Sequence, residues 1–166
     1  MASHSDIFKE IIQKIPTRDS IYNLIGDLQN LEELSYGKDS MAFTEKYDEI
    51  NTIYDNMLLS GIVEEEKSSD NIVAYRLFIQ EFIKYLQEIN TVSVTLAFKP
   101  DDEFIQGLYH FLKMSFNFTF CLDMHYDKDI GAGLILEYQG KYLDLSLRKK
   151  VETYLETNKE YVFSSL

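Results

Sequence analysis

The sequence predicts an α+β fold: an antiparallel helical bundle over residues 1–89, followed by a small mixed α/β domain over residues 90–166. Two observations support this division. Up to residue 89, apolar side chains recur every three or four positions, as on one face of a helix. At Asn90 the period changes to two and β-branched residues become frequent, as in a half-buried strand. We expect the second domain to hold a sheet of three or four strands and two helices.

Two helices are expected before residue 40. The first covers residues 5–15 and ends at Pro16, because proline lacks the N–H group that a continuing helix would need. The second covers residues 19–36 and ends at Gly37, a residue type common just after helices. Both are apolar on one side only, so each must bury that side against a neighbour.

A third and a fourth helix complete the predicted bundle. The third opens at Asp39–Ser40 and continues towards Gly61, and the fourth covers residues 71–89. Between them, residues 64–70 form a polar connector. Since all four helices are amphipathic, packing them against one another is the simplest way to bury their apolar sides.

The second domain begins with a strand, a helix and another strand. Residues 91–98 and 116–124 both alternate between apolar and polar side chains. Pro100 and Asp101 start the helix between them, which ends near Met114. Two strands joined by a helix in this way are expected to be parallel neighbours in one sheet.

The rest of the domain is organised by residues 127–151. This stretch begins at a polar turn and predicts a strand over residues 134–138 and a hairpin turn at Gly140. A short return strand and a final helix follow. Either Asp144 or Ser146 is placed to cap the first turn of that helix.

This order of residues resembles the C-terminal signature of the delta-subunit family of F-type ATP synthases, called the oligomycin-sensitivity-conferring protein in mitochondria. The resemblance is clearest over residues 79–157, and the N-terminal part diverges from the family. The signature consists of an acid, a pair of small residues, a glycine turn, Asp-x-Ser and a basic helix start. Its members here are Asp127, Ala132, Gly133, Gly140, Asp144, Ser146 and Arg148. The resemblance implies a structural role for them.

The function implied by the resemblance is that of a non-catalytic stator subunit. It would link the catalytic head of a rotary F-type ATP synthase to the b subunit of the peripheral stalk and resist rotation of the head. The implied partners are the N-terminal segment of the alpha subunit and the C-terminal helix of the b subunit. No cofactor, small-molecule substrate or nucleic acid is expected. The residues that we expect to meet the stalk lie in the last helix: Leu147, Val151, Tyr154 and Leu155.

The resemblance also implies a location. The protein would be peripheral to an energy-coupling membrane through the complex, on the cytoplasmic face of a bacterial membrane or on the matrix or stroma side of an organelle. No stretch of the sequence approaches the run of about 20 apolar residues needed to span a bilayer. The first residues also lack the charged and apolar regions of a secretory signal.

Composition agrees with a protein that binds other proteins. The formal net charge of −12 argues against nucleic acid or anionic lipid as a partner, because such surfaces attract clustered Lys and Arg. Residues 1–90 carry 8 Lys or Arg and 17 Asp or Glu, so the helical half would favour a basic partner segment. The single cysteine, Cys121, has apolar neighbours and is expected in the core.

The sequence predicts no catalytic site. Its three histidines lack the spacing of a metal-binding pair on one element. Cys121 and His125 would lie about 13 Å apart along an extended strand, too far for a nucleophile and its base. Asp127 and Asp129 lack the later ligands of a calcium loop. The glycines at 131 and 133 do not form a phosphate-binding loop pattern.

Two other functions fit some of these observations. An unrelated acidic adaptor that binds a basic amphipathic helix would explain the charge. A stator subunit of a V/A-type ATPase, similar to the E subunit, also has a glycine-pair strand and a terminal helix. That subunit normally begins with a long charged helix, which Pro16 and Gly37 would interrupt here.

Overall fold

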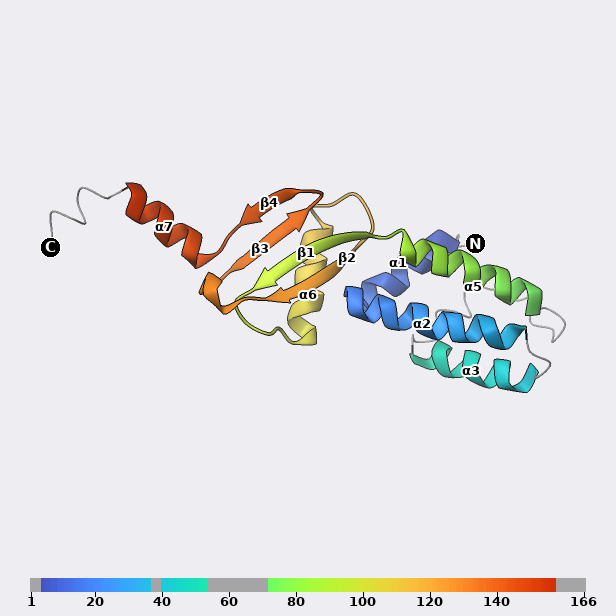
Figure 1. Cartoon of the computed structure of the whole chain (residues 1–166). Helices are drawn as coiled ribbons and strands as arrows, with labels where there is room; N and C mark the ends of the chain where they lie inside the picture. The colour runs from blue at the N-terminus through green and yellow to red at the C-terminus, as the bar shows by residue number, and fades with distance from the viewer. Residues whose placement is uncertain (1–3, 37–39, 54–71, 158–166) are drawn as a thin grey trace. The chain divides into compact units, whose positions relative to one another are not determined.

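Figure 1 shows the computed structural model, which describes residues 4–36, 40–53 and 72–157. The helices are α1 (His4–Lys14), α2 (Arg18–Ser35), α3 (Ser40–Ile53), α5 (Ile72–Gln87), α6 (Asp102–Lys113) and α7 (Leu147–Thr157). The strands are β1 (Asn90–Leu96), β2 (Phe120–Tyr126), β3 (Leu134–Tyr138) and β4 (Lys141–Asp144), with a short 3₁₀ helix, η2 (Lys128–Ile130). Helices followed by a small mixed α/β part confirm the α+β class. The predicted end of the third helix and the polar connector lie outside the described residues.

The described residues form two compact units. The first holds those up to residue 90 together with residues 116–121, and the second holds residues 91–115 and those from 122 onward. The first unit therefore takes in a short piece of chain from beyond the change of period at residue 90. The division into domains at residue 89 stays a prediction.

Helix α2 is the centre of the first unit, because it packs against both α3 and α5. It begins where Pro16 ends the preceding segment, and Thr17 caps it by accepting a hydrogen bond from the backbone N–H of Ser20 at 3.3 Å. Of the stripe predicted from its periodicity, Leu34 is half-buried and the other members are buried: Ile21, Leu24, Ile25, Leu28 and Leu31. The apolar side of this helix thus forms part of the core of the first unit.

Aromatic rings join the outer helices to α5. The ring of Phe8 in α1 stacks on Phe82 with 4.3 Å between centroids and also lies 5.5 Å from Phe78. In α3, Tyr47 meets Tyr75 edge-on at 5.1 Å. Such contacts add to the free energy of burying the rings themselves.

A side chain of α5 caps the C-terminal end of α2. Arg76 donates from Nη2 to the carbonyl oxygen of Ser35 at 2.7 Å and from Nε to its hydroxyl at 2.9 Å. Its guanidinium group also lies over the ring of Tyr36, 4.0 Å from the centroid. The last carbonyl groups of a helix lack partners within the helix, and a cation there complements the helix dipole. Arg76 therefore supplies both a hydrogen-bond donor and a positive charge to the end of α2, and it links α2 to α5.

The four strands form one sheet in the order β2–β1–β3–β4. β3 pairs antiparallel with β1 and with β4, while β1 and β2 run in the same direction on either side of the connecting helix α6 (Figure 1). The sheet is therefore mixed, and the expectation that the first two strands are parallel neighbours is confirmed.

The register of the sheet decides which side chains share a face, since directly opposed residues point the same way. One face, called the core face below, carries Val94, Leu96, Leu134, Leu136 and Leu143. The other, called the open face, carries Thr95, Ile135, Glu137, Tyr142 and Asp144. Val94 and Leu96 are fully buried, as are Tyr109 and Leu112 of α6. A crossover helix packs on the strands that it connects, so we place α6 on the core face.

The start of β2 differs from the prediction. The strand was expected over residues 116–124, but it begins at Phe120 and ends at Tyr126. The rings of Phe116, Phe118 and Phe120 lie 5.1 to 5.9 Å from one another. In an extended strand these three residues would share a face, but Phe116 and Phe120 would lie about 13 Å apart along it. The 5.3 Å between the centroids of their rings therefore indicates that the chain is not extended before Phe120.

Among the described residues, we find no helix with the length and apolar character needed to cross a membrane.

Tyr47 offers a test of this packing. Its hydroxyl is buried and, among the described residues, is the one buried side-chain polar atom without a hydrogen-bond partner. Removing an unsatisfied buried hydroxyl costs nothing in lost bonds, so Tyr47→Phe should leave the free energy of unfolding unchanged or raise it by about 1 kcal/mol. Tyr47→Ala, which also removes the ring, should lower it by about 3 kcal/mol or more. Urea denaturation measures both; a clear loss in Tyr47→Phe would contradict the unpaired hydroxyl.

The same residue should make stability depend on pH in alkaline solution. Burial, followed by the neighbouring Tyr75 and Asp48, raises the pKa of Tyr47 above its ordinary value. The unfolded chain loses this proton near pH 10, whereas the folded protein retains it. Stability from this residue is therefore complete below about pH 10 and declines above it. Tyr47→Phe should show a smaller decline over that range.

Candidate functional site

The β3–β4 hairpin closes through two residues, Gln139 and Gly140. Tyr138 pairs with Lys141, and the φ angles of the two turn residues are +49° and +75°. Positive φ at both central positions is what a type I′ turn requires, and the twist of that turn matches the twist of the strands. The hairpin predicted from Gly140 is therefore present.

Gly133 lies where two segments of backbone meet. Its φ is +87°, and a Cβ atom at this position would collide with the carbonyl oxygen of Leu145. On either side of the contact, the N–H of Leu145 donates to the carbonyl of Leu134 at 2.9 Å, and the N–H of Leu147 donates to that of Ala132 at 2.8 Å. The chain leaving β4 is thus held against the chain entering β3.

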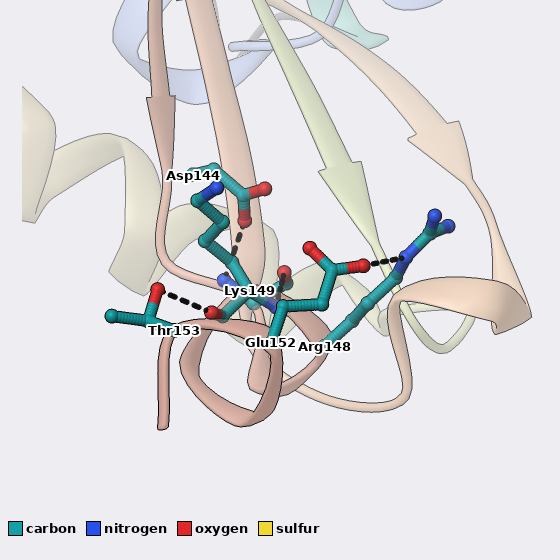
Figure 2. A network of polar contacts seen from close by, with 6 residues as sticks. Asp144, Arg148, Lys149, Glu152 and Thr153 are labelled. Carbon is teal, nitrogen blue, oxygen red and sulfur yellow. Dashed lines mark hydrogen bonds and ion pairs between the residues drawn. The ribbon is translucent and has the colours of Figure 1, made fainter. Parts of the chain in front are cut away.

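The next residues fix the first turn of α7. The carboxylate of Asp144 accepts a hydrogen bond from the N–H of Ser146 at 2.9 Å, and the hydroxyl of Ser146 accepts one from the N–H of Lys149 at 3.2 Å (Figure 2). Of the two candidate caps, Ser146 therefore caps the helix, while Asp144 orients the cap. Ser146 is buried, although it lies among exposed neighbours. Together these bonds define the direction in which α7 leaves the sheet.

The local electrostatics support the same arrangement. Hydrogen bonds from the hydroxyl and the N–H of Ser146 lower the pKa of Asp144, and the charges of Lys149 and Arg148 lower it further. The hydrogen bond from Arg148 to Glu152, 3.0 Å long, raises the pKa of Arg148. Both groups are therefore ionised at neutral pH.

A hollow of about 600 Å³ lies on the open face beside the start of α7. It is lined by Asp127, Ile130, Ile135, Tyr142, Asp144, Ser146, Arg148, Lys149 and Glu152. Its charged groups have both signs, and several are already bonded within the chain: Arg148 to Glu152, Asp144 to Ser146, and Asp127 to the N–H of Asp129 at 2.9 Å. Hydroxyl and carboxylate groups that serve as caps are poorly placed to act as a nucleophile or a base.

Helix α7 carries an exposed apolar stripe. Leu147, Val151 and Tyr154 recur at helical spacing, and all three are exposed. The side chain of Leu155, also expected to meet a partner, lies outside the described part of the structure. An isolated helix of 11 residues has little stability of its own, so a partner along this stripe would stabilise α7.

The predicted signature residues lie together in the second unit. Asp127 caps η2, Ala132 and Gly133 hold the chain that leaves β4, and Gly140 closes the hairpin. Asp144 and Ser146 set the start of α7, and Arg148 pairs with Glu152 four residues later. Sequence reasoning missed Glu152, although its spacing from Arg148 is that of a helical ion pair.

Sequence reasoning also missed two exposed leucines next to this region, Leu143 and Leu145. Alternation along β4 assigns both to one face of the sheet, but it does not say whether a helix covers them.

The residues examined for catalysis do not come together. Cys121 is buried, whereas His125 is exposed and lies 3.5 Å from the carboxylate of Asp123. His110 is exposed on α6. Within residues 4–36, 40–53 and 72–157, no group of three His, Cys, Asp or Glu side chains is arranged to hold a metal ion.

Comparison with known families identifies one match. The sequence model of the family described as "ATP synthase delta (OSCP) subunit" matches residues 40–157. The match ends where the expected resemblance ended, but it begins well upstream of residue 79 and includes α3 and α5 of the first unit. No curated protein matches the chain in sequence.

Gly133→Ala tests the contact that holds the end of β4. The added methyl group would meet backbone atoms, and the residue would keep an unfavourable φ, so we expect the free energy of unfolding to fall by about 2 kcal/mol or more. Gly107→Ala in α6 is the matched control, because a Cβ there meets nothing within 4 Å. That variant should gain about 1 kcal/mol from helix propensity. Equal effects in urea denaturation would contradict the close approach.

Asp144 and Ser146 can be tested by titration. The carboxyl pKa of Asp144, followed by NMR, should lie below its ordinary value of 3.8. Ser146→Ala removes the hydroxyl bond and should move the pKa up towards that value, while Thr153→Ala, further along α7, should leave it unchanged. Because the folded pKa is lowered, the stability that Asp144 contributes is present above about pH 4 and declines in more acidic solution. An unshifted Asp144 would contradict the capping geometry.

Proposed function

The chain belongs to the ATP synthase delta (OSCP) subunit family, and from this we propose that it is the stator link of a rotary F-type ATP synthase. Members of this family are non-catalytic subunits of the peripheral stalk, associated with the membrane through the complex. The proposed action is mechanical: the protein joins the catalytic head to the b subunit and keeps the head from turning with the rotor. The family match, which covers most of the chain, supports this function over an unrelated acidic adaptor or a V/A-type subunit.

The second unit provides the contact to the stalk in this proposal. Its partner would be the C-terminal helix of the b subunit, packed along Leu147, Val151 and Tyr154 of α7. The exposed stripe is the observation that supports this most directly, because an amphipathic helix recognises a partner helix through anchors at such spacing. The hydrogen bonds at Ser146 would transmit force, since they fix α7 to the sheet.

The first unit provides the contact to the head. Its partner would be the N-terminal segment of the alpha subunit, and the structure offers exposed apolar side chains on α5 for it. Val73 and Leu77 lie one turn apart, and Tyr36, under the guanidinium group of Arg76, is also exposed. The acidic surplus of residues 1–90 would favour basic residues in the partner segment.

The proposal is tested by purifying complexes on this chain and identifying their subunits by mass spectrometry. Co-purification of alpha, beta and b subunits is expected. Val151→Ser should weaken retention of b by about tenfold while alpha is kept, because it removes an apolar anchor from α7. Leu77→Ser should have the converse effect. Thr153→Ser is the matched control on α7, since it keeps the polar character of the residue.

Recovery of this chain alone, or with a basic protein unrelated to ATP synthase, would refute the stator function. Loss of both partners in Leu77→Ser would indicate that the variant is misfolded or that one surface binds both, and the thermal unfolding temperature of the variant separates those two cases.

A further inference from the structure

The first unit is discontinuous in sequence. It holds the described residues up to 90 and a second piece, residues 116–121, whereas residues 91–115 and those from 122 onward belong to the second unit. The chain therefore passes between the units at three places: at the two ends of the stretch 91–115 and again after residue 121. Two domains joined by an ordinary linker need only one such passage.

Residues 116–121 are packed like part of a core. The rings of Phe116, Phe118 and Phe120 lie 5.1 to 5.9 Å from one another, and Phe120 is fully buried. The next residue, Cys121, is 1% exposed. A segment that only connected α6 to β2 would be expected to run over the surface. This segment instead buries apolar side chains, and its contacts assign it to the first unit.

A hydrogen bond within the first unit joins this segment to the end of the helical part. Asn90 donates from Nδ2 to the backbone carbonyl oxygen of Thr119 at 3.3 Å, and the two residues are 29 positions apart in sequence. Asn90 is the last residue of the first unit before the chain leaves it. The bond therefore joins the point where the chain leaves the first unit to the segment where it returns. Because the bond is partly buried, its loss would leave a polar group poorly solvated.

Strand β2 continues the connection into the second unit. It runs from Phe120 to Tyr126, and its first two residues belong to the first unit while the rest belong to the second. Continuous secondary structure is one physical route by which two regions of a protein are coupled. A displacement of β2 would therefore act directly on the segment that the first unit has buried.

We infer that residues 116–121 are a structural part of the first unit, so that the stability of the helical part depends on chain supplied by the α/β half. A chain that ended at residue 90 would lack the three rings and the acceptor of the Asn90 bond. In the proposed stator, a load on the second unit would reach the first at three points of the chain. That consequence for the stator rests on the proposed function.

The test measures hydrogen exchange in the full chain without any partner. The slowest amides of α2 and α5 report the opening of the first unit, and those of β3 and β4 report the opening of the second. Phe118→Ala removes a half-buried ring from the segment. It should speed exchange in α2 and α5 about tenfold and leave exchange in β3 and β4 unchanged.

Phe104→Ala is the matched control. Phe104 lies in α6 of the second unit, and its ring is 5.1 Å from the ring of Phe98. The variant removes the same kind of side chain from the other unit, so exchange in α2 and α5 should stay unchanged. Phe118→Leu keeps an apolar side chain in the segment and should speed exchange in α2 and α5 about threefold, so the test does not depend on the folding of the alanine variant.

The outcomes decide the assignment of the segment. Faster exchange confined to β3 and β4 in the Phe118 variants would overturn the inference, because the segment would then stabilise the second unit. Unchanged exchange in both units would overturn it too, and so would a Phe104→Ala effect on α2 and α5 as large as that of Phe118→Ala. None of these measurements involves a partner, so the stator function is decided separately by the co-purification experiment.

Discussion

The close approach of Gly133 to Leu145 is the constraint on which the second unit depends. With no side chain at residue 133, the backbone after β4 can lie against the backbone before β3, and the bonds at Ala132 and Leu134 form on either side of the contact. A larger residue would separate these segments. The direction of α7, the position of its cap and the exposure of its apolar stripe all follow from this one contact.

That geometry gives the polar groups of this region structural roles. Asp127, Asp144 and Ser146 each accept a hydrogen bond from a backbone N–H group, and each does so at the start of a helix or turn. Their polarity fixes the shape of the chain. Among their exposed neighbours are large apolar side chains: Leu143, Leu145 and the α7 stripe. The proposed stator link would need this combination of rigid junctions and apolar contact surfaces.

The first unit also contains a rigid junction, in this case between two helices. Arg76 links the end of α2 to α5 through Ser35, while Tyr36 lies under its guanidinium group. The link makes α2, which packs on both α3 and α5, a fixed element. Exposed apolar residues of α5 are therefore presented on a defined surface, which lowers the entropic cost of binding a partner segment.

The sequence by itself determined the class of fold, the position of most elements and the family. Periodicity is a local property, so the change at Asn90, the stripe of α2 and the glycine hairpin could be recognised without coordinates. The alternation of side chains predicted that β2 starts at residue 116, but the strand starts at Phe120. The reason is that the rings of Phe116, Phe118 and Phe120 cluster through contacts that alternation does not reveal. Only the tertiary structure decided which apolar residues stay exposed. Leu136 and Leu143 are directly opposed in the sheet and look alike in the sequence pattern, yet Leu136 is half-buried and Leu143 is exposed. The physical reason is their place in the sheet, because Leu136 lies on a strand with a neighbour on both sides and Leu143 on the edge strand β4.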